Sequence, residues 1–506
     1  TLHLAQAMVS FPSEKQPPLW LVTQGAQRVE RNNLIDKGVT NPQQSSLWGL
    51  GRAIALECPQ LNCRCIDLGS EDNANVSDAA LIESLTCEGK DTQIAYRAEK
   101  RYVMRLAKQT TNANKVSIYS EGSYLISGGL GALGLEVSQW LVSQGARHIT
   151  LLGRRHPSAA ASAAIEAMRQ AGAEILVCQA DVSDMAQLTR AIQQLNQSAI
   201  LLRGVVHTAG VLADAPLQKQ GWEGFLSVFQ PKLQGGWNLH QATQDLNLDF
   251  FICFSSAASL LGGTAQSNYA AANAFLDGLC EYRQGLGLPA LSINWGPWEK
   301  EGMAQVLSTA HRKRLARLGL KLIPPELGLQ VFSQQLGAQG QLGVIAFDWQ
   351  SLTQHLSEVK NSVFEDINPL EFAYKGRSTQ DNKLSLRQQL EAIAPSKRSQ
   401  LLRQVLNKEV SHVLGLPSHQ AINPEQNLLE FGLDSLMAME LRNQLQKQFE
   451  IEIPISQFME GVHISALVEM MDQHYAILLS ETDQGLKEIS ENRNLKKDEI
   501  PSQAAL

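Results

Sequence analysis

Residues 123–134 read SYLISGGLGALG, and this stretch joins a short apolar run to a glycine-rich turn and then to an amphipathic segment, 132–144. Gly129, Gly131 and Gly134 have the spacing G-x-G-x-x-G, which permits a tight turn, close approach of a ligand to the backbone and close packing of helix on strand. The stretch predicts a strand–turn–helix unit whose helix N-terminus binds a pyrophosphate. The alternative is a plain tight turn without a ligand.

Strand-like runs and helical segments alternate through residues 113–375, and helical periodicity is clearest in 132–144 and 269–283. Such alternation predicts a Rossmann-type, doubly wound parallel sheet with helices on both faces, which we call the catalytic half. Its expected strands are Ser123–Ser127, His148–Leu152, Ile175–Gln179, Gly204–Thr208, Phe250–Ser255, Ala290–Asn294 and Val344–Phe347.

Residues 1–112 form a second α/β pattern, which we call the structural half. Strand-like runs at 20–23, 63–68 and 92–96 surround a helix-like stretch at 42–56. The first run ends in Gly25 alone, without a glycine-rich turn. This half therefore resembles an α/β unit that has lost its cofactor loop.

The C-terminal part has three sections. Residues 376–395 are polar and predict a linker. Residues 396–475 form a compact, mostly helical stretch, which predicts a small helical bundle. Residues 476–506 are charged and poor in apolar side chains, which favours a disordered tail over a docking helix.

The composition excludes several classes of protein. The net charge of −7 over 506 residues argues against a nucleic-acid partner. No apolar run of about 18 residues exists to cross a membrane, and the start at Thr1 without a signal peptide suggests an excised piece or a mature fragment. The seven cysteines include no C-x-x-C pair, and Cys63 and Cys65 suit a strand better than a metal site, so we expect reduced thiols, no metal and a cytoplasmic location.

The residues after the second and third strands of the catalytic half predict the cofactor. Arg154 and Arg155 follow the second strand, where an NAD enzyme usually has an acid, and arginine suits a 2′-phosphate. NADPH is therefore favoured over NADH, against the alternative of a surface arginine pair. Asp181 and Val182 follow the third strand, with Asp181 placed to bond adenine. The contacts expected from the turn are Gly128, Gly129, Leu130, Gly131, Leu133 and Gly134.

A Ser/Tyr pair gives the most specific signal. Ser256 ends a strand-like run, and Tyr269 follows it by thirteen residues at the head of Tyr-Ala-Ala-Ala-Asn. With the glycine turn and the arginines, this pair resembles the short-chain dehydrogenase/reductase superfamily and, more closely, the ketoreductases of modular polyketide synthases. In the general superfamily a lysine stands four residues after the tyrosine, but this sequence has Asn273 there. Lys232 fits the upstream lysine of polyketide ketoreductases.

The chemistry that the resemblance implies needs these residue types. Hydride addition to a ketone builds negative charge on oxygen, which must be stabilised and protonated. Tyr269 would donate the proton, Lys232 would stabilise the resulting phenolate, and Ser256 would hold the carbonyl. Asn273 would orient the lysine and a relaying water.

Other segments extend the resemblance. His207, Thr208, Ala209 and Gly210 resemble the family's segment beside the nicotinamide, and residues 301–304 would begin a mobile lid. Leu212 and Asp214 match the B-type fingerprint except for Ala213 between them, and Leu261 stands where A-type enzymes have tryptophan. The resemblance therefore predicts a B-type enzyme that makes the D-hydroxyl.

Residues 430–441 read EFGLDSLMAMEL and resemble the phosphopantetheine site of acyl carrier proteins. Ser435 would carry the group at the start of a helix, where the helix N-terminus favours the charge of a phosphodiester. Flanking helices are expected at 401–414 and 464–471. The alternative is an ordinary capped helix in a small bundle.

Together these features predict NADPH-dependent reduction of a β-ketoacyl thioester held on 4′-phosphopantetheine. The implied partners are the tethered substrate, upstream ketosynthase and acyltransferase domains, and a phosphopantetheinyl transferase. A reductase fold without activity, and an origin in a fatty-acid or mixed peptide–polyketide line, are the alternatives.

Overall fold

A computed structural model of the chain describes most of its residues, in two compact units, 1–376 and 377–506, each described by itself. The described residues are 1–11, 16–31, 34–35, 38–70, 74–86, 91–98, 100–109, 116–196, 200–299, 319–348, 362–364, 366–367, 390, 393, 395–414, 422–430, 433, 435–449, 453, 457–458 and 462–474. Nearly all of the linker, the whole 476–506 tail and the lid residues 301–304 lie outside them. No helix in the described part combines the length and apolar content that a bilayer crossing requires.

A seven-stranded sheet forms the core of the catalytic half, in the order β14-β12-β11-β10-β7-β8-β9. Every pair is parallel, which confirms the Rossmann-type prediction. The strands are β7 (Ser123–Ser127), β8 (His148–Gly153), β9 (Glu174–Gln179), β10 (Leu202–His207), β11 (Phe250–Ser256), β12 (Leu291–Trp295) and β14 (Gly340–Val344). The helices are α4 (Ala132–Ser143), α5 (Ala159–Gln170), α6 (Met185–Asn196), α7 (Trp222–Phe229), α8 (Gly235–Thr243), α9 (Ala257–Leu261), α10 (Ser267–Gly285) and α12 (Pro325–Gln335).

Two apolar cores lie on the two faces of this sheet, because successive side chains of a strand point to opposite faces. Tyr124 and Ile126 of β7 belong to one core, together with α4 and α5 residues such as Leu141 and Ile165. Leu125, between them, belongs to the other core with Leu188 and Leu276 from α6 and α10. Burial on both faces explains why the strands are continuous apolar runs rather than alternating ones.

The chain reverses its direction of winding at β7, which lies between β8 and β10. Ser127, the last residue of β7, is in register with His207, the last residue of β10. A crevice outside the carboxyl ends of strands at such a switch point is the usual ligand site of an open parallel sheet. The glycine turn that follows Ser127 therefore begins at that point.

The expected last strand, Val344–Phe347, is wrong in its bounds. Sheet pairing with β12 runs from Gly340 to Val344, because Leu342 and Val344 pack against the core there. The apolar run continues into β15 (Ala346–Phe347), which instead pairs antiparallel with β13 (Leu320–Lys321). An apolar run alone did not show where one pairing partner replaces the other.

The structural half is a four-stranded sheet in the order β1-β4-β5-β6. Its elements are α1 (Leu2–Val9), β1 (Trp20–Gln24), α2 (Ser45–Glu57), β4 (Arg64–Leu68), α3 (Ala74–Thr86), β5 (Gln93–Arg97) and β6 (Lys100–Val103), with a small hairpin of β2 (Glu30–Arg31) and β3 (Leu34–Ile35). The sequence pattern did not predict α1, α3, β6 or the hairpin of β2 and β3.

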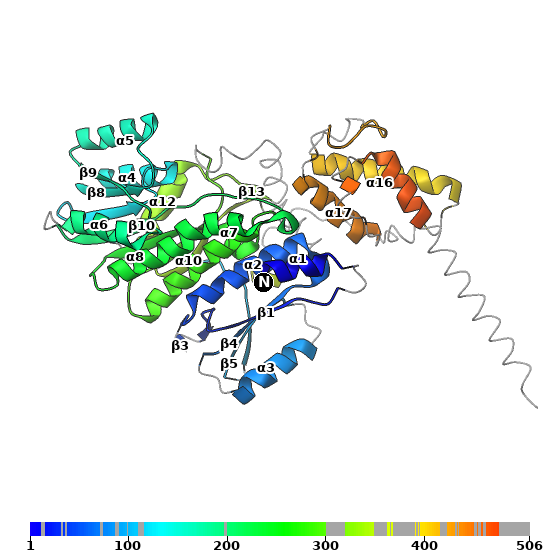
Figure 1. Cartoon of the computed structure of the whole chain (residues 1–506), viewed down its shortest axis with the longest axis horizontal. Helices are drawn as coiled ribbons and strands as arrows, with labels where there is room; N and C mark the ends of the chain where they lie inside the picture. Colours follow the sequence, from blue (N-terminus) through cyan, green and yellow to red (C-terminus); the bar gives the residue numbers. More distant parts are fainter. Residues whose placement is uncertain are drawn as a thin grey trace, which may run out of the picture. The chain divides into compact units, whose positions relative to one another are not determined.

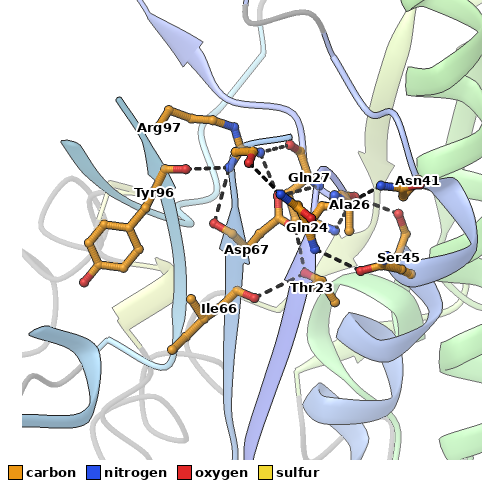
Figure 2. Close-up of polar contacts among 12 residues, drawn as sticks. Thr23, Gln24, Ala26, Gln27, Asn41, Ser45, Ile66, Asp67, Tyr96 and Arg97 are labelled. Carbon is orange, nitrogen blue, oxygen red and sulfur yellow. Dashed lines mark hydrogen bonds and ion pairs between the residues drawn. The ribbon is translucent and has the colours of Figure 1, made fainter. Parts of the chain in front are cut away.

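Asp67 at the end of β4 fills the turn after β1, as Figure 2 shows. Its carboxylate is fully buried and accepts hydrogen bonds from the backbone N–H groups of Ala26 (2.9 Å) and Gln27 (3.1 Å). It also accepts one from the Thr23 hydroxyl at 2.6 Å and pairs with Arg97 at 2.7 Å. Backbone N–H groups that could bind an anion after β1 are thus satisfied by a carboxylate of the chain itself, which is the structural counterpart of the lost glycine loop.

Helix α2 of the structural half packs directly on α10 of the catalytic half (Figure 1). A Cβ on Gly49 would lie 2.2 Å from the carbonyl oxygen of Ala270, and one on Gly278 would lie 2.2 Å from the Ser45 hydroxyl. The backbones approach this closely only because both positions are glycine. The close crossing fixes α10 against the structural half.

The second unit contains α16 (Pro395–Leu414), α17 (Ser435–Phe449) and a helical segment at 464–474. Leu406, Leu441 and Leu467, one from each helix, are fully buried. Six of the seven cysteines lie in the described part of the chain, and these six are free and buried.

Gly49→Ala is expected to destabilise the first unit by about 1–3 kcal/mol, because the added methyl would overlap the Ala270 carbonyl in a packed interface. Chemical denaturation measures the change. Gly221→Ala is the control, since a Cβ there meets nothing within 4 Å. Equal losses in the two variants would contradict the assigned contact.

Candidate active site

The glycine turn leaves one side of its backbone open. Gly128 has φ +74°, which favours glycine, and a Cβ on Gly134 would lie 2.4 Å from the Gly128 carbonyl. Gly131 is the N-cap of α4, and a Cβ there would meet only the Gly128 oxygen, at 3.3 Å. Leu130 packs against Gly153 at the end of β8. The turn fits a pyrophosphate approaching Gly131 and the first N–H groups of α4.

Arg154 and Arg155 come directly after β8 and are both exposed. The Arg154 carbonyl accepts a hydrogen bond from Gln179 at 3.2 Å. Neither guanidinium has a hydrogen bond or an ion pair within the part of the chain that the structure describes. Both side chains are exposed just after the carboxyl end of β8, which pairs with β7 next to the glycine turn.

The segments after β9 and β10 contain the other residues that were expected to bind the cofactor. The Asp181 carboxylate accepts hydrogen bonds from the Ser183 backbone (2.9 Å) and hydroxyl (2.6 Å), and Val182 is buried. The His207 ring is fully buried and bonds to the Ser127 hydroxyl, so it lies beneath the ligand-binding surface rather than on it. Burial and the nearby Lys232 charge lower the pKa of His207 to about 3, which keeps the ring neutral.

Lys232 enters the site from a π-helical turn, residues 230–234, between α7 and α8. Pro231 lacks the backbone N–H that an α-helical hydrogen bond would need at this position. The π-helical turn accommodates the proline, so the chain continues as a helix into α8. The Lys232 side chain is buried, and its Nζ donates to the Phe254 carbonyl at 3.1 Å. A Cβ on Gly210 would lie 2.9 Å from Lys232 Cε, so the glycine makes room for the side chain.

Helix α10 and the end of β11 bring the other three residues to the lysine. Lys232 Nζ lies 5.4 Å from the centre of the Tyr269 ring. Asn273, one turn further along α10, donates from Nδ2 to the Tyr269 carbonyl at 2.8 Å, and its buried Oδ1 has no partner among the described residues. Ser256 caps α9, with its hydroxyl accepting from Ala258 N–H at 3.2 Å. The pair Ser256 and Tyr269, with Lys232 and Asn273 that the resemblance implies, thus converge.

Burial sets the protonation states. It raises the pKa of Tyr269 to about 12, although hydrogen bonds from Asn273 and Ser256 lower the pKa in part. It lowers the pKa of Lys232 to about 8, although the negative charge of Asp277 raises this pKa in part. Near neutral pH the tyrosine is a neutral proton donor and the lysine is a cation close to its titration point.

Sequence reasoning missed a buried network beneath these residues. The Asp277 carboxylate accepts hydrogen bonds from Ser259 (2.7 Å), Ser292 (2.6 Å) and Asn294 (2.9 Å). The same Ser259 hydroxyl lies 2.8 Å from the Ser256 carbonyl oxygen, so the two acceptors share its single proton. Asp277 follows Tyr269 by eight residues, on the same face of α10, and this helical spacing was the available signal.

The fingerprint residues lie beside the helix that carries Tyr269. Asp214 is exposed and accepts a hydrogen bond from Gln266 at 3.0 Å. Leu212 is half-buried and packs against the cluster that contains Tyr269. In the second unit, Ser435 is the first residue of α17, as the carrier motif predicts, and Met437 packs inward.

Comparison with known families agrees with this geometry. Residues 122–300 match the KR domain, and residues 404–471 match the phosphopantetheine attachment site. Residues 1–106 match the Rossmann fold domain of the polyketide synthase extender module SpnB. Fold and site define a reductase of the short-chain dehydrogenase/reductase type. The chain belongs to the ketoreductases of modular polyketide synthases and carries a phosphopantetheine-binding domain after the reductase.

Individual relatives support this assignment. A solved A1-type ketoreductase is 31% identical, with a TM-score of 0.67, over 74% of this chain and 77% of that chain. Polyketide synthase GfsB of Streptomyces halstedii is 34% identical over 90% of this chain. A phenolphthiocerol/phthiocerol polyketide synthase of Mycobacterium tuberculosis is 31% identical over 92%. The chain spans only 8% and 25% of the lengths of these two synthases.

We expect kcat/KM to fall as the pH rises through about 8, because Lys232 then loses the charge that stabilises a tyrosinate while Tyr269 stays protonated. Initial rates between pH 6 and 10 measure the profile. Lys232→Arg should remove this alkaline limb, since arginine keeps its charge throughout that range. An unchanged limb in the arginine variant would show that another group titrates.

Proposed function

We propose that the chain reduces a β-ketoacyl thioester, held on 4′-phosphopantetheine at Ser435, to the β-hydroxyacyl thioester with NADPH. Convergence of Lys232, Ser256, Tyr269 and Asn273 is the observation that carries this proposal. An inactive reductase fold would not need a buried lysine beside a buried tyrosine, because burying an ammonium group is costly.

The residues around the glycine turn fit a dinucleotide. Gly128, Gly131 and Gly134 would receive the pyrophosphate, with Arg154 and Arg155 at the 2′-phosphate and Asp181 near adenine. NADPH, when bound, supplies the hydride that adds to the β-carbon. Thr208, Ala209 and Gly210 would line the nicotinamide end, above the buried His207.

Ser256 and Tyr269 would bind the ketone oxygen, where negative charge develops as the hydride arrives. Tyr269 donates its phenolic proton to that oxygen, and the Lys232 ammonium stabilises the phenolate that remains. The low dielectric around these buried groups strengthens the interaction between the charges. Asn273 offers its free Oδ1 to a water that returns a proton toward the lysine.

The substrate would arrive on the carrier domain rather than from solution. Ser435 at the start of α17 would receive phosphopantetheine from a phosphopantetheinyl transferase. Upstream ketosynthase and acyltransferase domains would build the β-ketoacyl chain, as the family of long synthases implies.

For stereochemistry, we propose the B-type course and the D-hydroxyl product. Leu212 and Asp214 retain two residues of the B-type fingerprint, and Leu261 replaces the A-type tryptophan. Solved neighbours include both A-type and C2-type enzymes, so fold similarity does not distinguish the types and the fingerprint carries the proposal.

The deciding experiment loads the purified full chain with a β-ketoacyl group through a phosphopantetheinyl transferase and follows NADPH absorbance and the intact mass. We expect the tethered acyl group to gain two hydrogens, with chiral analysis giving the D-alcohol. Tyr269→Phe should lower turnover by about 10²–10⁴-fold, the scale of losing a positioned acid.

Ser435→Ala is the control for tethering, and it should abolish loading while leaving the reductase fold intact. Loading of wild type without reduction would refute the proposed reductase activity. A predominantly L-alcohol would refute the B-type proposal alone.

Arg154→Ala should weaken NADPH binding by about 10–100-fold and NADH binding much less, because one charged hydrogen bond to phosphate is lost. Cofactor fluorescence titration measures both dissociation constants. Arg190→Ala removes another exposed arginine, on α6, and serves as control. If Arg154→Ala weakened NADPH and NADH binding equally, Arg154 would not be the residue that binds the 2′-phosphate.

A further inference from the structure

Glu57, the last residue of α2, reaches from the structural half into the loops around the active site. Its side chain is buried. Oε2 accepts a hydrogen bond from the Leu217 backbone N–H at 2.7 Å, and Oε1 accepts one from the Ala265 backbone N–H at 2.9 Å. One carboxylate therefore joins two loops that are separated by almost fifty residues of sequence.

The first of these loops follows β10 and contains the stereochemical fingerprint, and the second leads from α9 into the helix that carries Tyr269. Ala215 N–H donates to the Ala265 carbonyl at 2.9 Å, which ties the loops directly. Asn268 donates from Nδ2 to the Ala213 carbonyl at 2.8 Å, and its Oδ1 accepts from Tyr269 N–H at 2.7 Å. The fingerprint loop is thus bonded to the residue that precedes the catalytic tyrosine.

The second loop contains a residue in a backbone conformation that is unfavourable for any residue other than glycine. Ala265 has φ +61°, in the left-handed region that a residue with a Cβ rarely adopts. Gly262 in the same loop has φ +81°, and a Cβ there would lie 2.8 Å from the Arg52 carbonyl of α2. The loop therefore lies directly on α2, and its left-handed residue Ala265 is the one whose N–H donates to Glu57.

We propose that Glu57 is a positioning residue through which the structural half fixes the orientation of the substrate, and with it the face of the ketone that is reduced. This inference rests on the proposed function. The carboxylate is suited to the role because it can accept in two directions at once, whereas a neutral amide offers a single acceptor oxygen. Glu57 acts through the two loops and not by touching the reacting atoms.

Asp67 provides a matched control within the same half. It too is a buried carboxylate that accepts two backbone N–H groups, those of Ala26 and Gln27, but those groups belong to the structural half itself (Figure 2). Asp67→Asn should therefore lower the stability of the first unit without changing the conformation of the active-site loops. Comparing the two variants separates positioning from general stabilisation.

The test uses Glu57→Gln and Asp67→Asn in the full, phosphopantetheine-loaded chain. Glu57→Gln should lower the ratio of the two alcohol enantiomers by about tenfold, the scale of one lost hydrogen bond. The KM for a diketide thioester should rise, while the dissociation constant of NADPH stays unchanged. Asp67→Asn should keep the wild-type enantiomer ratio at a comparable loss of Tm.

Glu57→Asp is the second variant if Glu57→Gln fails to fold. Its carboxylate is one methylene shorter and cannot reach both loops, so we expect a smaller fall in the same ratio. An unchanged ratio in a folded Glu57 variant, or an equal fall in Asp67→Asn, would overturn the inference while leaving the proposed function intact. A wild-type chain that loads but does not reduce would overturn both.

Discussion

The parallel register of β7, β10 and β11 is the constraint on which the rest of the site depends. Ser127, His207 and Cys253 lie side by side across these strands. β7 and β10 end at Ser127 and His207, and β11 continues three residues further to Ser256, at the same edge of the sheet. The glycine turn, the segment 208–210 and Ser256 meet there although Gly128 and Ser256 are 128 positions apart in the sequence. Helices cover both faces of such a parallel sheet, and ligands bind in the crevice outside the carboxyl ends of its strands.

Burial gives this edge its chemistry. Lys232 is brought in by a π-helical turn at Pro231, and its ammonium lies among groups that exclude water. Desolvation raises the pKa of Tyr269 and lowers that of Lys232, so the donor stays protonated and the cation is held near its titration point. The buried network around Asp277 includes Ser259, whose hydroxyl contacts the carbonyl of Ser256 at the end of β11.

The structural half uses one kind of group for two purposes. Asp67 satisfies the N–H groups of its own vestigial turn, so this half presents no anion site after β1 among the described residues. Glu57 also accepts hydrogen bonds from two backbone N–H groups, but these belong to loops of the catalytic half. Close packing at Gly49 makes that reach possible, because it fixes α2 against the helix that carries Tyr269.

Local pattern was enough to determine the alternating strands and helices, the glycine turn, the Ser256–Tyr269 spacing and the helix start at Ser435. Each of these depends on neighbours within a few residues, or on a motif with fixed spacing. The pattern did not give the bounds of β14, because an apolar run does not show which strand it pairs with. Nor did it reveal Glu57, Asp67 or the Asp277 network, since a carboxylate in a sequence looks the same whether it meets solvent or two distant N–H groups. Their roles follow from which chain segments the tertiary structure packs around them, because most buried polar groups find a hydrogen-bond partner in the fold rather than in water.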